Sequence, residues 1–228
     1  MPLTLLFDLD GTLVDTDPLH FEAFSTLLKE YDKPAIDFEF YKTRIMGFGH
    51  LEIFSMLFPE QTVYTALAER KESLFRNLVR DLEPKVGLLD LLDWAKDRKL
   101  RCGVVTNAPR ENAMLMLGAL RLGERFETIV FGEELTHGKP HPMPYLTGLE
   151  RLAGKAHAAI AFEDSLSGVR SASGAGIYTV GVRSSLSEEA LRKAGASHTI
   201  EDFRDTALWS ELRRHMDEAN PTNGKLTP

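Results

Sequence analysis

The chain has 228 residues, a formal net charge of −7 and 43% hydrophobic residues, which is ordinary for a globular protein. The negative charge argues against nucleic acid as a partner, because such binders need a basic face. No stretch is long and apolar enough to span a membrane, and no secretory segment is visible, so we predict a cytoplasmic protein. The only cysteine, Cys102, lies in an apolar run and cannot form an internal disulfide. The acidic composition and the lack of an apolar tract favour a monomer.

The first apolar run, residues 3–7, leads directly into the sequence Asp8-Leu9-Asp10-Gly11-Thr12. A continuous run of this length is typical of a strand buried on both faces, which places Asp8 at the strand's carboxyl end. In open parallel sheets this edge binds ligands. Two carboxylates two residues apart are costly unless a cation or a proton lies between them. Taken alone, the motif could also be a turn built from Asp and Gly.

After this motif the hydrophobic pattern changes to helical spacing. Asp17 is predicted to cap a helix whose first turn contains Pro18. Four helices are predicted, with apolar residues recurring at helical spacing from Phe21, Phe38, Leu51 and Val63. No strand pattern interrupts them. Residues 16–82 are therefore predicted to be an all-helical cap, joined to the rest of the chain by two linkers that can act as a hinge.

From Leu88 onward, helical patterns alternate with short apolar runs that are typical of strands. The predicted strands are residues 102–105, 128–131, 158–162 and 177–182. This alternation implies right-handed crossovers and a parallel sheet with helices on both faces. We predict a doubly wound, Rossmann-like α/β core formed by residues 1–15 and 83–220. Residues 221–228 are polar and aperiodic, and are predicted to be a disordered tail.

Polar side chains follow the ends of several predicted strands. They are Asp8 and Asp10, Thr106 and Asn107, Lys139 after a loop, and Glu163 and Asp164. Each has an ordinary explanation alone, as a helix cap or a solvated charge, but a parallel sheet brings all of them to one edge. The carboxylates are hard oxygen ligands that suit Mg²⁺, which would offset the repulsion between an anionic nucleophile and a phosphate. Lys139 and the Thr106 hydroxyl can hold phosphoryl oxygens.

These residues, in this order, resemble the four motifs of the haloacid dehalogenase superfamily. The motifs here are DLDGT at residues 8–12, Thr106-Asn107, Lys139-Pro140, and Glu163-Asp164-Ser165 with Gly168. The likeness covers essentially the whole chain. The helical insertion is similar to the cap of the subgroup that contains β-phosphoglucomutase and small sugar-phosphate phosphatases.

The resemblance implies a role for each core residue. Asp8 would be the nucleophile that forms an aspartyl-phosphate, and Asp10 the general acid and then the base. Mg²⁺ would be held by Asp8, the carbonyl of Asp10 and Asp164, with Glu163 acting directly or through a water. Thr106 and Lys139 would bind the transferring phosphoryl group. Asp10 favours phosphoryl transfer over dehalogenation, because an alkoxide leaving group needs a proton and a halide does not.

The resemblance also suggests substrate-binding residues, some of them in the cap. They are Asn107 in the core and Thr16, His20, His50 and Arg76 in the cap. The mutase grips a distal phosphate with a cap-loop arginine, whereas the matching place here is taken by His50. Arg76 lies near the position of a mutase lysine and could bind a phosphate, or be a solvated helix charge. The missing arginine favours hydrolysis.

The leading prediction is therefore an Mg²⁺-dependent phosphatase that acts on small phosphorylated metabolites, sugar phosphates above all. The alternative is a phosphosugar mutase of the β-phosphoglucomutase type. A non-catalytic phosphoacceptor switch, which also combines acidic residues with Thr and Lys, is a third reading, but a simple switch does not need a helical lid.

Overall fold

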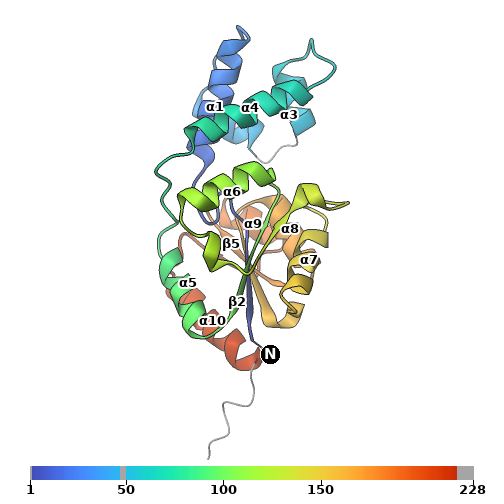
Figure 1. Cartoon of the computed structure of the whole chain (residues 1–228). Coiled ribbons are helices and arrows are strands. Elements are labelled where there is room, and N and C mark those ends of the chain that lie inside the picture. Colours follow the sequence, from blue (N-terminus) through green and yellow to red (C-terminus); the bar gives the residue numbers. More distant parts are fainter. Residues whose placement is uncertain (1, 47–49, 220–228) are drawn as a thin grey trace, which may run out of the picture. The chain divides into compact units, whose positions relative to one another are not determined.

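The computed structural model describes residues 2–46 and 50–219 (Figure 1). The predicted tail, residues 221–228, lies outside this range. The chain divides into two compact units. One is formed by Met1–Asp15 and Glu83–Pro228, and the other by Thr16–Leu82. Among the described residues, no helix has the length and apolar character needed to cross a membrane.

The first unit is built on a six-stranded parallel sheet with strand order β3-β2-β1-β4-β5-β6. Its strands are β1 (Thr4–Phe7), β2 (Arg101–Thr106), β3 (Thr128–Phe131), β4 (Ala159–Glu163), β5 (Tyr178–Val182) and β6 (His198–Ile200). The strand order reverses direction at β1, which is central and flanked by β2 and β4. Ligands of open α/β sheets bind at the carboxyl ends of the strands beside such a switch point.

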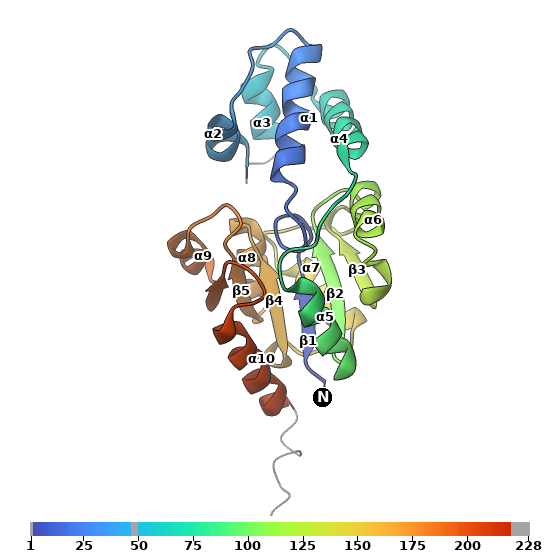
Figure 2. The ribbon, with the colours of Figure 1, turned by 90° about the vertical axis from the view of Figure 1, so that its left-hand side faces the viewer.

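Helices cover both faces of the sheet. Figures 1 and 2 show α5 (Leu88–Asp97) and α10 (Thr206–Ala219) on one face, and α7 (Met143–Arg151) and α8 (Leu166–Gly174) on the other. The unit also contains α6 (Arg110–Ala119), α9 (Glu188–Ala194) and 3₁₀ turns at Gly123–Arg125, Gly132–Glu134 and Ala156–Ala158. The predicted doubly wound α/β fold is confirmed.

The centre of the sheet is apolar on both faces, as the continuous run in β1 indicates. Leu5, Leu6 and Phe7 are fully buried. The Phe7 ring stacks on Phe162 of β4 at a centroid distance of 4.8 Å, and the two residues are register partners. Burial of large side chains of this kind stabilises the fold by about 1.5 to 3 kcal/mol each. The strand that carries Asp8 is therefore anchored in the rigid middle of the core.

The structure adds elements that the sequence pattern did not reveal. The sixth strand, His198–Ile200, has three residues, which is too short to show a periodic signal. It pairs in parallel with β5 at the sheet edge. The helices α9 and α10, before and after it, were also not predicted.

The second unit is helical. It contains α1 (Asp17–Glu30), α2 (Phe38–Phe40), a π turn (Tyr41–Ile45), α3 (His50–Leu57) and α4 (Thr65–Leu78). Helices α1 and α4 pack side by side, and Phe24, Phe54 and Phe75 are buried between the helices.

One local prediction for this unit was wrong, and another was incomplete. Thr16, not Asp17, occupies the N-cap position of α1, so that Asp17 is the first helical residue and Pro18 the second. The second predicted helix is present, but it is α-helical only over Phe38–Phe40 and continues as a π turn, in which the amide of Met46 bonds to the carbonyl of Tyr41.

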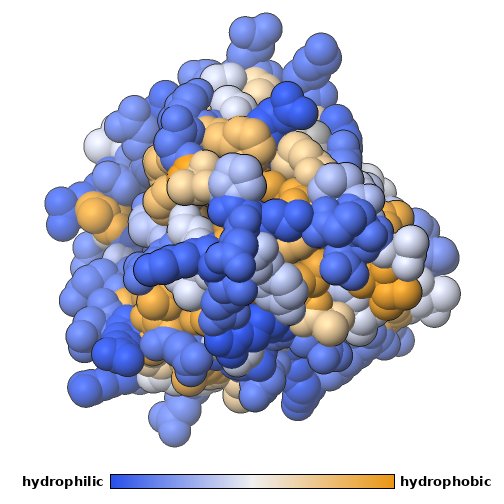
Figure 3. Space-filling model, turned by 90° about the horizontal axis from the view of Figure 1, so that it is seen from above, coloured by the Kyte–Doolittle hydropathy of each residue, from blue (hydrophilic) through white to orange (hydrophobic). Residues whose placement is uncertain are grey.

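Figure 3 shows one face of the molecule as a mixture of hydrophilic side chains and smaller apolar patches. Large apolar side chains that are strongly exposed include Leu51 and Val63, both in the helical unit. Both line the same hollow of this unit, which is described with the candidate site below.

Candidate active site

The ammonium of Lys139 lies among the carboxyl ends of the central strands. Its Nζ donates to Asp8 Oδ1 at 2.6 Å, to Glu163 Oε1 at 2.5 Å and to the carbonyl of Val105 at 2.7 Å. Asp8 directly follows β1, Val105 lies in β2, and Glu163 is the last residue of β4. A single buried cation therefore joins three neighbouring strand ends.

Burial and neighbouring charges shift the pKa values of both Asp8 and Lys139. Loss of solvent raises the pKa of the Asp8 carboxyl well above its usual value. The positive charge of Lys139 opposes this rise, whereas Glu163, Asp164 and Asp10 add to it. The pKa of Lys139 is raised, because the attraction of Asp8 and Glu163 outweighs the effect of its burial. Lys139 therefore stays charged at any physiological pH.

Three carboxylates of this edge could hold a metal ion. Asp8, Glu163 and Asp164 each offer an oxygen, and these oxygens lie within 4.8 Å of one another. Clustered carboxylate oxygens suit a hard divalent cation such as Mg²⁺. The side chain of Asp10 is not part of this group, and Asp10 is partly exposed, with its backbone bridged to Val14.

The two acidic residues after β4 are held by different neighbours. Asp164 Oδ2 accepts from the Ser184 hydroxyl at 2.9 Å, and its Oδ1 from the Thr12 hydroxyl at 3.4 Å. Gly11 has φ +70°, and a Cβ there would overlap the Asp164 carboxylate. Glycine is therefore required at this position both for backbone conformation and for space.

A second glycine leaves room for Glu163. A Cβ at Gly168, in the first turn of α8, would overlap the Glu163 carboxylate. The helix begins at the capping residue Ser165, whose hydroxyl accepts from the amide of Gly168 at 3.0 Å. In the predicted motif, Ser165 is therefore the helix cap and Gly168 leaves space for the Glu163 carboxylate. Neither requirement can be read from the sequence alone.

The sequence missed Tyr145 as part of this site. Its spacing on α7 indicated an ordinary core residue, and its ring is indeed fully buried. Its hydroxyl, however, donates to Glu163 Oε1 at 2.7 Å. A buried tyrosine hydroxyl needs such a partner, which is the signal that could have drawn attention to it. Burial and the nearby Glu163 carboxylate raise the pKa of Tyr145, so the hydroxyl stays protonated and donates.

Thr106 and Asn107 lie at the carboxyl end of β2. Thr106 is buried, and its hydroxyl accepts from the amide of Ala108 at 2.9 Å. The Asn107 side chain bonds to the main chain of Lys139 through both its oxygen and its nitrogen. The structure thus brings Asp8, Thr106, Asn107, Lys139, Glu163 and Asp164 to one edge of the sheet.

The helical unit holds the remaining predicted residues. The His20 ring stacks on Phe75 at 4.1 Å, and its Nδ1 lies 2.8 Å from Lys71 Nζ. Lys71 is buried and also contacts Glu72 at 3.0 Å. The sequence missed Lys71, although its spacing from Leu67 places it on the apolar face of α4.

The other predicted residues of this unit lie at the ends of its helices. Thr16 is buried at the start of α1, and Arg76 is half-buried in the last turn of α4. His50 begins α3, but its side chain lies outside the described part of the chain.

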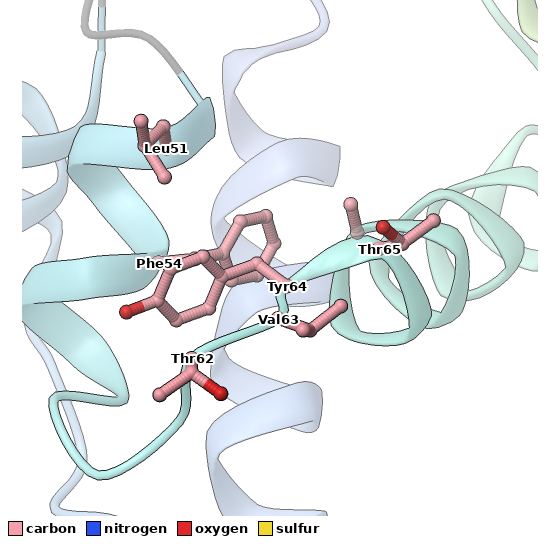
Figure 4. A pocket seen from close by; sticks show the side chains of 7 residues that line it. Leu51, Phe54, Thr62, Val63, Tyr64 and Thr65 are labelled. Carbon is pink, nitrogen blue, oxygen red and sulfur yellow. The ribbon is translucent and has the colours of Figure 1, made fainter.

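The helical unit also has a hollow of about 480 Å³ (Figure 4). Its lining comes from α3, α4 and the segment between them, and consists of Leu51, Phe54, Thr62, Val63, Tyr64, Thr65 and Ala68. Among the predicted catalytic and binding residues whose side chains the structure describes, none lines this hollow. The acidic edge of the sheet is therefore the candidate site.

The fold and the site define a doubly wound α/β enzyme with a lysine set among acidic strand ends. The family model described as haloacid dehalogenase-like hydrolase matches residues 5–182. A phosphorylated carbohydrates phosphatase from Thermotoga maritima is 35% identical, over 84% of this chain and 91% of that protein. A phosphoglycolate phosphatase from Rhodospirillum rubrum is 30% identical, over 92% and 91% respectively. The crystal structure of CbbY from Rhodobacter sphaeroides in complex with phosphate has a TM-score of 0.77 and 27% identity, over 90% of this chain and 96% of that chain.

This protein therefore belongs to the haloacid dehalogenase-like hydrolase family, and the resemblance inferred from the motifs is confirmed. With phosphatases at 30 to 35% identity over most of its length, it is a phosphoric monoester hydrolase.

Proposed function

We propose that this protein is an Mg²⁺-dependent phosphatase that hydrolyses small phosphorylated metabolites, chiefly sugar phosphates, through an aspartyl-phosphate on Asp8. The observation that carries this proposal is the buried contact of Lys139 with both Asp8 and Glu163, beside Asp164. A relative that is named for phosphorylated carbohydrates, at 35% identity, supports the substrate class.

Asp8 is the proposed nucleophile. One of its carboxylate oxygens forms a bond to phosphorus while the bond from phosphorus to the ester oxygen breaks. Lys139 orients this carboxylate through Oδ1. In the second step a water attacks phosphorus, the bond to Asp8 breaks, and inorganic phosphate leaves. The carboxylate of Asp8 is thereby restored.

Asp10 is proposed to move the protons. It donates a proton to the leaving ester oxygen in the first step, and it takes one from the attacking water in the second. Its partial exposure suits a group that must change its protonation state in each cycle. Lys139 and the Thr106 hydroxyl, both at the same edge of the sheet, are proposed to bind the transferring phosphoryl oxygens.

The donor set fits the proposed metal, because three carboxylate oxygens lie close together. Asp8, the carbonyl of Asp10 and Asp164 would hold Mg²⁺, with Glu163 acting directly or through a water. When bound, the ion supplies positive charge that offsets the repulsion between the Asp8 carboxylate and the phosphate. Ser184 and Thr12 keep Asp164 in place for this role.

The helical unit is proposed to act as a cap that selects the substrate. Of the substrate-binding candidates from the sequence, this unit holds Thr16, His20, His50 and Arg76, and Asn107 lies in the core. We add Lys71 as a residue that orients His20, because its buried ammonium contacts the His20 ring and is itself paired with Glu72. The cytoplasmic location and the monomeric state stay predictions.

The test is a phosphate-release assay with a panel of small phosphate esters, with and without Mg²⁺. We expect release that depends on Mg²⁺ and is abolished in the Asp8→Asn variant, with an unchanged circular dichroism spectrum. Release by a folded Asp8→Asn protein would contradict the nucleophile. Incubation with β-glucose 1-phosphate and a trace of bisphosphate tests the alternative, since accumulation of glucose 6-phosphate would indicate a mutase.

A further inference from the structure

The side-chain amide of Asn107 is bonded to the main chain of Lys139 on both sides. Its Oδ1 accepts from the amide N–H of Lys139 at 3.1 Å, and its Nδ2 donates to the carbonyl of Lys139 at 3.2 Å. Asn107 directly follows β2, whereas Lys139 lies 32 residues later, before α7. The amide thus ties the segment that carries the ammonium to the end of a central strand.

Two glycines make room for this amide. A Cβ at Gly132 would overlap Asn107 Oδ1, and a Cβ at Gly138 would lie 3.0 Å from the same atom. Real Cβ atoms rarely come this close to another atom, so a side chain at either position would push the amide away. The slot around Asn107 is therefore formed by three separate parts of the chain, namely the end of β2, the turn at Gly132 and the segment at Gly138.

The position of the Lys139 main chain determines several contacts of its ammonium. The Nζ atom meets Asp8, Glu163 and the Val105 carbonyl at 2.5 to 2.7 Å, and the lysine side chain is 3% exposed. These three short hydrogen bonds together fix the position of the ammonium. A shift of the main chain would lengthen at least one of them, and misplacement of about 1 Å can cost about a hundredfold in rate.

We propose that Asn107 is a positioning residue, which sets the place of Lys139 and does not bind the substrate. This replaces the substrate-binding role that the sequence suggested for it. The inference rests on the proposed function, because it assigns Asn107 a part in phosphoryl transfer through Lys139. It goes further in predicting that the effect of Asn107 does not depend on which phosphate ester is the substrate.

The first test compares the Asn107→Ala and Gly132→Ala variants, using the esters that the wild type hydrolyses. The second variant keeps Asn107 but displaces its amide. Gly118→Ala is the matched control, since a Cβ at Gly118 meets nothing within 4 Å. We expect both test variants to lose about 10- to 100-fold in kcat by the same factor for every ester, with nearly unchanged KM. The control should keep its activity.

The second test is a double-mutant cycle with Lys139→Met. If Asn107 acts through Lys139, Asn107→Ala has no further effect on kcat once the ammonium is removed. Losses that multiply in the double variant would overturn the proposal, as would a loss confined to some esters or expressed mainly in KM. Failure of the wild type to release phosphate from any ester would instead refute the proposed function, so the two failures are distinguishable.

Discussion

Removal of the Lys139 ammonium tests the electrostatic balance of the site most directly. The Lys139→Met variant keeps a side chain of similar length but loses the hydrogen bonds to Asp8 and Glu163. The side chains of both acids are at most 10% exposed, so water cannot replace the lost contacts. Two buried carboxylates would then face each other, with Asp164 nearby, without the cation that joins them.

The size of the effect follows from this burial. Removing one partner of a buried ion pair costs about 3 to 5 kcal/mol, because the remaining charge is left uncompensated. The carboxylates can avoid this cost by taking up a proton, which raises the pKa of Asp8 further. A cost of about 3 kcal/mol corresponds to about a hundredfold smaller ionised fraction of Asp8 at a fixed pH below that pKa.

The assay is the pH dependence of kcat/KM for phosphate release at a fixed Mg²⁺ concentration well below saturation, because a saturating ion would itself keep Asp8 ionised. We expect Lys139→Met to lose at least about a hundredfold at neutral pH, and to recover part of the loss as the pH rises and Asp8 ionises. The exposed lysine at position 155 offers a control, since Lys155→Met should leave the profile unchanged. An acidic limb of the profile that stays in place in Lys139→Met would refute this reasoning.

Three further predictions concern the same site. Gly11→Ala should weaken Mg²⁺ binding by at least about tenfold, as measured by calorimetry. The positive φ costs an alanine about 1 to 2 kcal/mol, and its Cβ displaces the Asp164 carboxylate. An unchanged Mg²⁺ affinity would contradict this prediction. Tyr145→Phe should lower the free energy of unfolding in urea by about 1.5 kcal/mol, since Glu163 loses a buried donor. Burial raises the pKa of Asp8 in the folded, metal-free protein above its ordinary value of 3.8, so the folded state binds this proton more tightly than the unfolded chain does. In EDTA, the free energy of unfolding of the wild type should therefore fall relative to that of Asp8→Asn as the pH rises from about 4 through the raised pKa of Asp8. A rise over this pH range would contradict the expected direction.

The sequence predicted much of the fold because buried strands leave a local mark. Residues 3–7 of the apolar run match β1 (Thr4–Phe7) closely, and the predicted strand 128–131 coincides with β3. The elements that were missed or misjudged lack such a mark. The strand His198–Ile200 is too short for a periodic signal, and the π turn at Tyr41–Ile45 keeps the apolar spacing of a helix while its hydrogen bonds differ.

The residues of the candidate site likewise include some that the sequence could reveal and some that it could not. Asp8, Glu163 and Asp164 could be found because each follows an apolar run, and the carboxyl ends of parallel strands meet at one edge of the sheet. The roles of Tyr145 and Lys71 could not be found in this manner. Each occupies an apolar helix face, where spacing indicates core, and only the hydroxyl or ammonium at its tip reveals a contact with a site residue.

The sequence by itself determined which chemical groups are present and at which edge they gather, because both follow from local patterns and the rules of parallel sheets. Only the tertiary structure decided which atoms meet. Lys139 Nζ reaches Asp8 across 131 residues of chain, and the Asn107 amide faces the Lys139 main chain across 32. Such contacts depend on side-chain directions and on the space left at glycines such as Gly132. The periodic pattern of a single strand or helix carries no information about them.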